Sequence, residues 1–401
     1  MNGSSAVQSA GAGGPRPAGR IVVWGLLAHT PFGGMVWQVL HYLVGLRRLG
    51  FDVWYVEDAD QMMLDLAAKD WVVSAKRNAA FVDRYLGAVG MGERWVVRTP
   101  GSRECFGARD WHGLLRLYSE ADLVINLCGS HELCTHHDGI RDLLYLETDP
   151  VQNQVDLALG LERGIEELRR YATLATYATN IYGDDCLIPA SGRQWLVTVP
   201  PVVLSSWDTG SPPRSRTLTT VMNWSSPARS ITWQDQRWSW SKRSALQRLS
   251  GLPARTSAPL AIAMRETGRK VRDRLCVAGW TVSDAAELDR PGAYRRFIRS
   301  SYGEMSVAKE QYVAPRSGWI SDRTVCYLAA GRPAVVERTG IAGVPLGAGL
   351  LDFATMDEAV VAIDAITSGY ERHAVAARGL AAEYFSAEKV LRDLLERAGL
   401  W

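Results

Sequence analysis

The segment 312–336 carries the side chains best suited to bind an anion. Its sequence, YVAPRSGWISDRTVCYLAAGRPAVV, predicts a turn at 316–318, a helix that ends at Gly331, and a short apolar strand. The small and basic residues near the helix start are Arg316, Ser317, Gly318, Ser321 and Arg323. A helix start offers unpaired backbone N–H groups and the positive end of the helix dipole, and guanidinium groups fit phosphate oxygens. We therefore predict a diphosphate site here; an ordinary capped helix with solvated arginines is the alternative.

Five residues that precede this segment are expected to complete the same donor site. Asn223 and Trp224 end a predicted strand, and Lys242 opens the next helix, from which a cation can reach phosphate groups. Glu304 and Lys309 lie just before the turn. For these two residues, an ion pair on a helix surface is the alternative interpretation.

Tryptophan is unusually dense in one polar stretch of the chain. Five of the fifteen tryptophans fall between residues 207 and 240, at positions 207, 224, 233, 238 and 240. They can form an aromatic wall for a base, a sugar or a flat acceptor, or they can anchor a loop to the domain surface. We assign Trp240 to acceptor binding.

The loop after the first predicted strand holds a candidate base. Residues 21–24 predict a strand, the loop GLLAHTPFGG follows, and a helix up to Gly50 leads to a second strand at 53–56. This βαβ order places the loop at the ligand edge of a parallel sheet. His29 in the loop could take a proton from an acceptor, although a histidine bonded to the backbone is an equal alternative. Phe32, Gly33 and Gly34 are predicted to contact the acceptor.

A second cluster of reactive side chains follows the strand predicted at 123–127. Its members are Cys128, His131, Cys134, His136 and His137. Compact Cys and His spacing can bind zinc, but this spacing matches no structural zinc site, so we predict no metal and assign His131 to the acceptor side. Glu147 and Asp149 follow the next predicted strand and are alternative bases, with a solvated loop acid as the simpler interpretation of each.

Composition excludes several classes of protein. The chain has 401 residues, a net charge of +2 and a pI near 8.2, which give no argument for nucleic acid binding. No charge-poor run reaches the length of a membrane span. The six cysteines lack a framework spacing, so we expect a reducing, cytoplasmic environment.

The order of predicted elements indicates an α/β protein with two similar halves. Residues 1–19 are expected to form a disordered tail, 20–204 the first doubly wound domain, and 205–216 a Ser/Pro/Gly-rich linker. Residues 217–370 should form the second domain, and 371–401 the C-terminal helices. Within these bounds we predict long helices at 67–86 and 156–172. Two such halves place a binding cleft between them.

Two regions resemble nucleotide-sugar-dependent glycosyltransferases of the type with two Rossmann domains (GT-B). The opening PFGGMVWQVLHYLVGLRRLGFDVWYVED is similar to their acceptor side, and GEMSVAKEQYVAPRSGWISDRTVCYLAAGRPAVVERTG is similar to the donor motif of a bacterial group. The turn through Ser317 and Trp319 is also similar to the Gly-Trp-Asn-Ser turn of plant and antibiotic glycosyltransferases. That motif continues to a ribose-binding Glu; here Asp322 and Thr324 lie near that place, but no Glu does. We assign Trp319 and Asp322 to donor binding.

The resemblance implies donor binding by the second half, acceptor binding by the first half and no metal. It also implies that His29 acts as the base and that Glu304 and Lys309 lie near the donor. We expect transfer of a sugar from a nucleoside-diphosphate sugar, the only co-substrate, to a small-molecule acceptor in natural-product (antibiotic) biosynthesis. A UDP-sugar 2-epimerase-like enzyme and a non-catalytic nucleotide-sugar-binding protein are the alternatives. A homodimer is compatible with the sequence.

Overall fold

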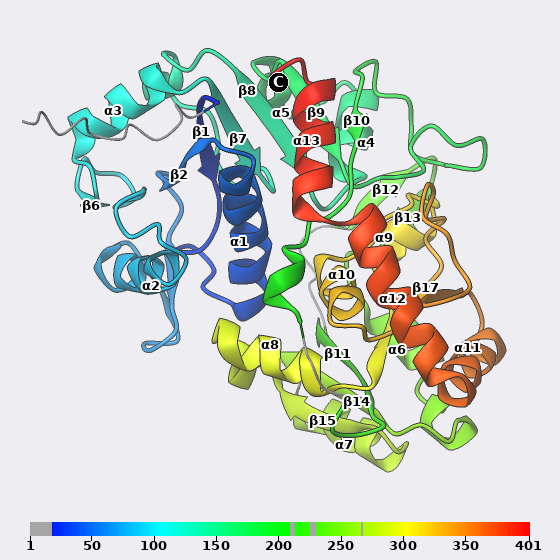
Figure 1. Ribbon diagram of the computed structural model, residues 1–401. Helices are drawn as coiled ribbons and strands as arrows, with labels where there is room; N and C mark the ends of the chain where they lie inside the picture. The colour runs from blue at the N-terminus through cyan, green and yellow to red at the C-terminus, as the bar shows by residue number, and fades with distance from the viewer. Residues whose placement is uncertain (1–17, 209–212, 225–229, 266–267) are drawn as a thin grey trace, which may run out of the picture.

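The computed structural model describes residues 18–208, 213–224, 230–265 and 268–401, which form two α/β lobes (Figure 1). Most of the predicted tail and part of the predicted linker therefore lie outside the described residues. In the described part of the linker, Trp207 is fully buried and packs against Trp37 and His41 of the first lobe. The start of this connection is thus anchored in the core.

The first lobe is built on an eight-stranded sheet with the order β10-β9-β8-β7-β1-β2-β5-β6. All neighbouring strands are parallel except β5 and β6. The strands are β1 (Arg20–Trp24), β2 (Asp52–Glu57), β5 (Trp95–Arg98), β6 (Cys105–Gly107), β7 (Leu123–Leu127), β8 (Leu143–Glu147), β9 (Thr173–Thr176) and β10 (Leu196–Val197). The strand order reverses between β1 and β7, which creates the crevice where ligands of such sheets bind.

Helices cover this sheet because their apolar residues recur on one side. The helices are α1 (Gly33–Arg48), α2 (Lys76–Gly87), α3 (Trp111–Glu120), α4 (Gln152–Ala158) and α5 (Glu162–Arg169). In α1, Val36, Val39, Leu40 and Leu43 follow a helical spacing and are buried.

The second lobe is built on a parallel six-stranded sheet with the order β15-β14-β11-β16-β17-β18. The strands are β11 (Leu218–Asn223), β14 (Leu260–Arg265), β15 (Thr281–Asp284), β16 (Gly303–Ser306), β17 (Ala334–Glu337) and β18 (Leu350–Phe353). The helices are α6 (Arg243–Arg248), α7 (Arg269–Val277), α8 (Pro291–Ser300), α9 (Glu310–Val313), α10 (Asp322–Ala329), α11 (Met356–Ser368) and α12 (Tyr370–Tyr384). Its strand order reverses between β11 and β16, so each lobe has the doubly wound pattern that the sequence predicts.

The chain crosses between the lobes a second time near its C-terminus. After α12, the backbone N–H groups of Val202 and Ala387 donate to Phe385 O (2.7 Å) and Val202 O (2.9 Å). The last helix, α13 (Ala387–Arg397), then packs against α1 (Figure 1). The approach is close, because a Cβ on Gly45 of α1 would lie 2.6 Å from Leu391 Cδ1. The C-terminal helices thus join the two lobes.

Two predicted helices are wrong in part. Residues 67–75 do not start a helix; β3 (Met63–Asp65) and β4 (Asp70–Val72) form an antiparallel hairpin ahead of α2. The predicted helix 156–172 is split into α4 and α5, because Gly160 has a φ of +65°. A second hairpin, β12 (Ile231–Trp233) and β13 (Gln236–Trp238), lies in the tryptophan-rich stretch. Among the described residues, no helix combines the length and apolar character that a membrane span requires.

Candidate functional site between the lobes

A cavity of about 360 Å³ lies where the start of α1 faces the second lobe. Its first-lobe residues are Phe32, Gly33, Gly34, Met35 and Gln38. The second lobe supplies Val221, Met222, Asn223, Trp240, Ser241, Lys242, Arg265, Ala285, Leu288, Asp289, Tyr294, Lys309, Trp319, Ser321, Asp322 and Arg323. The volume is that of a small-molecule site. Eleven residues predicted from the sequence to bind donor or acceptor are in these two sets.

Gly33 fits this wall because the second lobe comes very close to it. A Cβ on Gly33 would lie 2.3 Å from Leu288 O, so any other residue would push the lobes apart. Trp37 Nε1 donates to Pro291 O at 2.9 Å and holds the same contact. The glycine predicted to admit a ligand therefore admits the facing lobe.

The start of α10 forms the opposite wall. Ser321 caps the helix, because its Oγ accepts from the backbone N–H of Arg323 at 3.3 Å. The Arg323 guanidinium donates to Glu304 Oε1, Val221 O and Ser306 Oγ, each at 2.6 Å. Glu304 is fully buried behind Arg323. These three hydrogen bonds therefore fix the Arg323 guanidinium at the cavity wall and use three of its five N–H groups.

Lys242 differs from the other cations of the cavity. Its side chain is buried, and no carboxylate of the described residues lies within ion-pair distance of its ammonium. Burial, followed by the nearby charges of Arg323 and Lys309, holds the pKa of Lys242 well below its usual value. An anion that entered the cavity would relieve both effects.

The other two cations already have carboxylate partners. Lys309 Nζ lies 2.9 Å from Asp149 Oδ1 and 3.3 Å from the ring centroid of Trp240. Arg265 pairs with Asp289 and lies 4.1 Å from the ring centroid of Phe32. Neither Arg265 nor Asp289 was predicted from the sequence. Arg265 could have been predicted as a site residue, because it is the last residue of β14, next to β11 at the ligand edge of the sheet.

Asp322 is a partly buried carboxylic acid in the cavity wall. Gln38 Nε2, from α1 of the first lobe, donates to Asp322 Oδ2 at 3.0 Å. Burial raises the pKa of Asp322 to about 7, and the bond from Gln38 opposes that rise. Thus Asp322 sits where the two lobes meet and can exchange a proton near neutral pH.

The turn at 316–319 lies mainly outside the cavity and joins the lobes. Ser317 is fully buried, and its Oγ donates to Tyr312 O at 3.0 Å. The backbone N–H of Gly318 donates to Thr339 O, and Gly318 O accepts from Thr179 Oγ1, both at 2.7 Å. A Cβ on Gly318 would lie 2.4 Å from Asn180 N of the first lobe. The structure therefore does not bring Ser317 and Gly318 to the predicted anion site.

The neighbouring Arg316 is also turned away from the cavity. It is exposed and pairs with Asp185 at 2.6 Å, while its carbonyl accepts from Asn180 Nδ2 at 2.9 Å. Only Trp319 of this turn lines the cavity; its Nε1 donates to Thr148 O of the first lobe at 2.9 Å. The turn contributes one aromatic wall residue.

His29 is held beside the β3–β4 hairpin and does not line the cavity. Its backbone N–H donates to Glu57 Oε2 at 3.0 Å, and its ring lies 5.2 Å from that of Trp71. Burial lowers the pKa of His29 from its ordinary value.

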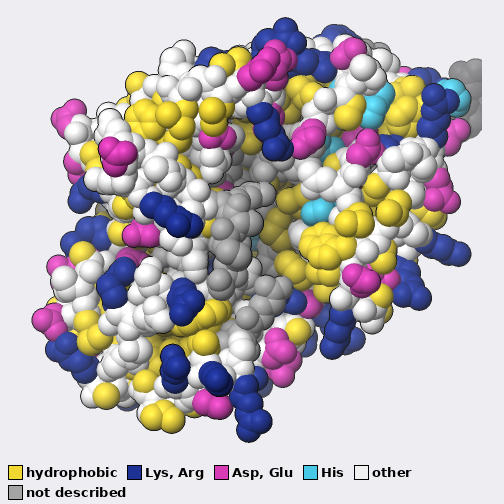
Figure 2. All heavy atoms as spheres, turned by 180° about the vertical axis from the view of Figure 1, so that it is seen from behind, with side chains coloured by type: hydrophobic (Ala, Val, Ile, Leu, Met, Phe, Trp, Pro, Cys, Tyr) yellow, Lys and Arg dark blue, Asp and Glu magenta, His cyan; other side chains and the backbone are white. Residues whose placement is uncertain are grey.

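Figure 2 shows hydrophobic side chains gathered along one edge of the boundary between the lobes.

Glu147 and Asp149 are both engaged by other groups. Glu147 is buried and accepts from Asn153 at 2.8 Å, Gln154 at 2.6 Å and Thr176 at 2.7 Å. Asp149 accepts from Lys309 and from the hydroxyl of Tyr312. Neither carboxyl lines the cavity, so the structure does not place the two alternative bases at the predicted reaction centre.

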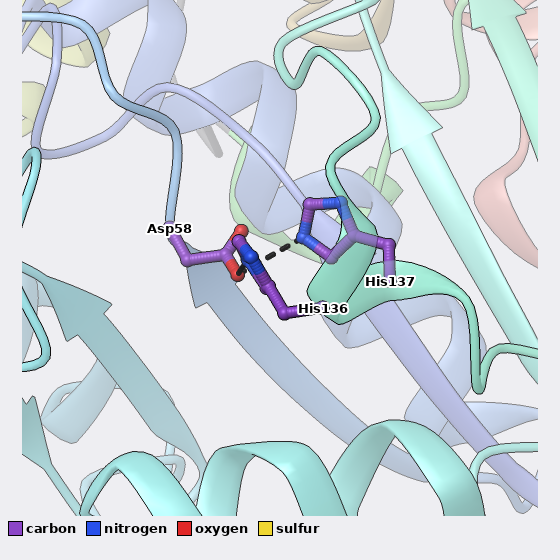
Figure 3. Close-up of side chains that lie close together, drawn as sticks. All are labelled: Asp58, His136 and His137. Carbon is purple, nitrogen blue, oxygen red and sulfur yellow. Dashed lines mark hydrogen bonds and ion pairs between the residues drawn. The ribbon is translucent and has the colours of Figure 1, made fainter.

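Three histidines of the predicted cluster surround Asp58, and two of them, His136 and His137, are drawn with it in Figure 3. His136 Nε2 and His137 Nε2 lie 3.0 Å and 3.1 Å from Asp58 Oδ2. The backbone N–H of Asp58 donates to His131 Nε2 at 2.9 Å, and the His131 ring stacks on Trp24. His131 is therefore a buried core residue and does not line the acceptor side of the cavity.

Hydrogen bonding in this cluster opposes metal binding. His137 Nδ1 accepts from the backbone N–H of Cys134 at 3.1 Å, so the proton of the neutral ring is on Nε2, which donates to Asp58. A metal on Nε2 would require that proton on Nδ1, where the Cys134 N–H already points. Three ligand atoms do lie close enough for an ion, but the residues fit a set of mutual hydrogen bonds better.

Most of the clustered tryptophans serve packing. Trp207, Trp224 and Trp238 are buried in hydrophobic cores, and Trp233 packs at the margin of one of them. Trp240 alone among the five lines the cavity. The anchoring alternative thus describes four of them.

Comparison with known proteins identifies the architecture. No protein-family profile and no curated protein sequence matches the chain. A solved α-glucosyltransferase in complex with UDP matches with a TM-score of 0.56 and 10% identity, over 95% of this chain and 100% of its own. HepE from Anabaena, in complex with UDP and glucose, matches with a TM-score of 0.56 and 11% identity, over 96% and 100%. AviGT4, a glycosyltransferase involved in avilamycin A biosynthesis, matches with a TM-score of 0.53 and 12% identity, over 95% of this chain and 97% of its own. At these identities the likeness shows the fold: the protein has the GT-B fold.

Proposed function

We propose that the protein is a glycosyltransferase that moves a sugar from a nucleoside-diphosphate sugar to a small-molecule acceptor. The observation that carries the proposal is Lys242, a buried cation that faces the cavity between the lobes without a carboxylate partner among the described residues. The departing diphosphate supplies the missing negative charge, and stabilising that charge lowers the barrier to transfer.

The donor lies on the second lobe in this proposal. Lys242 and Arg323 bind the diphosphate, while Asn223, Trp240 and Lys309 line the remaining wall. Uridine is the nucleoside we propose, because two of the similar solved structures are complexes with UDP. No metal or further cofactor is required, because the protein's own cation provides the charge.

The acceptor enters along the start of α1, past Phe32 and Gly34. We propose a small molecule of natural-product metabolism, since AviGT4 belongs to avilamycin A biosynthesis. One α-glucosyltransferase neighbour is bound to DNA, but the net charge of +2 gives this chain no comparable support. A cytoplasmic location and a homodimer are further predictions from the sequence.

Calorimetry with UDP tests the proposal directly. Removing a charge-assisted contact typically costs about 1.5–3 kcal/mol, so Lys242→Met should weaken UDP binding by about tenfold to a hundredfold. Lys270→Met is the matched control, because Lys270 is exposed on α7 and does not line the cavity. Its UDP affinity should equal that of the wild type.

The same proteins are then screened with UDP sugars for release of UDP. Turnover by the wild type supports transfer. Equal UDP affinity in Lys242→Met and the wild type would contradict the donor site, and an absence of turnover with every sugar would contradict the activity.

A further inference from the structure

The proposed transfer needs a group that accepts the proton of the attacking hydroxyl. His29 lies beside a hairpin outside the cavity wall, Glu147 accepts three hydrogen bonds, and Asp149 is paired with Lys309. The geometry therefore leaves the role of base to a residue that the sequence assigned to the donor.

Among the described residues, two carboxylates line the cavity, and only one of them has an arginine against it. Asp289 forms an ion pair with Arg265. Asp322 instead meets the neutral amide of Gln38, and this contact joins α10 of the second lobe to α1 of the first. Asp322 is thus next to the wall formed by Gly33, Gly34 and Met35, where the acceptor enters in the proposed function.

Capping does not explain the presence of Asp322. The side chain that caps α10 is Ser321, and an acid at the first position of a helix is normally ionised and exposed. Here the side chain is partly buried against the first lobe, and none of the described residues gives it a cationic partner, so its charge is costly unless it has a use.

We propose that Asp322 is the general base that accepts the proton of the acceptor hydroxyl, an inference that rests on the proposed function. As the acceptor oxygen forms its bond to the anomeric carbon, its proton moves to an oxygen of Asp322. The bond from the anomeric carbon to the diphosphate oxygen breaks, and its electron pair leaves on the diphosphate next to Lys242. Asp322 returns the proton to water after product release, and attack from the face opposite the diphosphate inverts the anomeric centre.

The surroundings of Asp322 suit this task near neutral pH. Its pKa of about 7 matches that of an efficient base, so kcat should fall as the pH drops through this value. The titratable groups that act on it or sense its charge are Asp149, Tyr42, Tyr177, Cys128 and Cys326. Burial raises the pKa of each of the last four, so they stay neutral in this pH range.

Two simple nucleophiles test the proposal without knowledge of the natural acceptor. UDP release from a UDP sugar is measured with water alone and with added azide, which attacks as an anion and needs no base. For Asp322→Asn, release with water should fall by about 100- to 10,000-fold. Release with azide and the Kd of UDP should stay close to the wild-type values.

Asp322→Glu keeps a carboxyl and should therefore restore part of the UDP release with water. The pH at which this release falls off should differ from that of the wild type. This readout does not depend on whether Asp322→Asn folds. Equal losses with water and azide would show a structural role and overturn the proposal. A loss in His29→Ala alone would also overturn it and return the role to the histidine. Failure of the wild type to bind UDP would instead remove the proposed function, which separates the two failures.

Discussion

The cavity between the lobes and the histidine cluster at Asp58 contain similar residue types but differ in how their polar groups are satisfied. In the cluster, Asp58 Oδ2 receives bonds from both His136 and His137, and the backbone N–H of Asp58 is bonded to His131; of the buried side-chain N and O atoms in this described cluster, only Asp58 Oδ1 is left without a hydrogen bond. In the cavity, Lys242 is buried without a carboxylate partner among the described residues.

This difference separates a structural cluster from a binding site. Groups that bond each other gain little from a ligand, because the ligand would have to break those bonds first. A buried charge that lacks a partner raises the energy of the empty protein and is relieved only by a ligand. A high density of reactive side chains is therefore a weaker guide to function than an unpaired charge that faces a cavity.

The largest effect should come from removing the centre of the hydrogen-bonded histidine cluster. Asp58→Asn replaces a buried acceptor with a group that opposes its histidine donors, so the free energy of unfolding should fall by about 3–5 kcal/mol. Urea denaturation measures this, with exposed Asp138→Asn, next to His137, as the control. The histidines around Asp58 hold its pKa well below the usual value. The difference from wild type should therefore persist at pH 7 and narrow as the pH falls below about 4.

At the cavity, a substitution should raise the free energy of unfolding instead of lowering it. Lys242→Met removes a buried unpaired charge, so the ligand-free protein should gain about 1 kcal/mol or more of unfolding free energy. The pKa of Lys242 is lowered on folding, so its destabilising effect is present below the unfolded pKa near 10.4. The gain should therefore shrink as the pH rises toward that value. Urea denaturation of ligand-free protein, with Lys270→Met as control, checks both statements; a loss of stability would contradict the comparison.

Metal removal should have no effect on either region. The Nε2–H of His137 donates to Asp58, and Lys242 supplies the positive charge at the cavity. Melting temperature and UDP release should be equal before and after treatment with EDTA. Stoichiometric zinc by elemental analysis, together with inactivation by EDTA, would make Asp58, His136 and His137 a metal site.

The smallest effect is expected at Arg316. Its guanidinium is exposed and pairs with Asp185, away from the cavity lining. Arg316→Ala should therefore leave the Kd of UDP unchanged in calorimetry, in contrast to Lys242→Met. A loss of affinity comparable to that of Lys242→Met would restore the phosphate role that the sequence suggests for Arg316.

Local pattern was sufficient for the fold and for half of the site. Alternating strands and helices with glycine stops predicted both doubly wound domains, and Ser321, Arg323 and Lys242 were found because each lies at a predicted helix start. The turn at 316–318 was misplaced because its position is set by bonds to Thr179 and Asn180, far away in the sequence. Similarly, nothing local shows that Gln38 contacts Asp322.

The return of α13 to the first lobe has a consequence for biosynthesis. The first lobe gains the helix that covers α1 only after residues 387–397 have left the ribosome, because Leu391 and Ala387 pack against Gly45. During translation this apolar surface of α1 is exposed while the entire second lobe is being made. The nascent protein therefore depends on α13 to complete its first domain, and a chain cut short before α13 would have a first lobe that is vulnerable to aggregation.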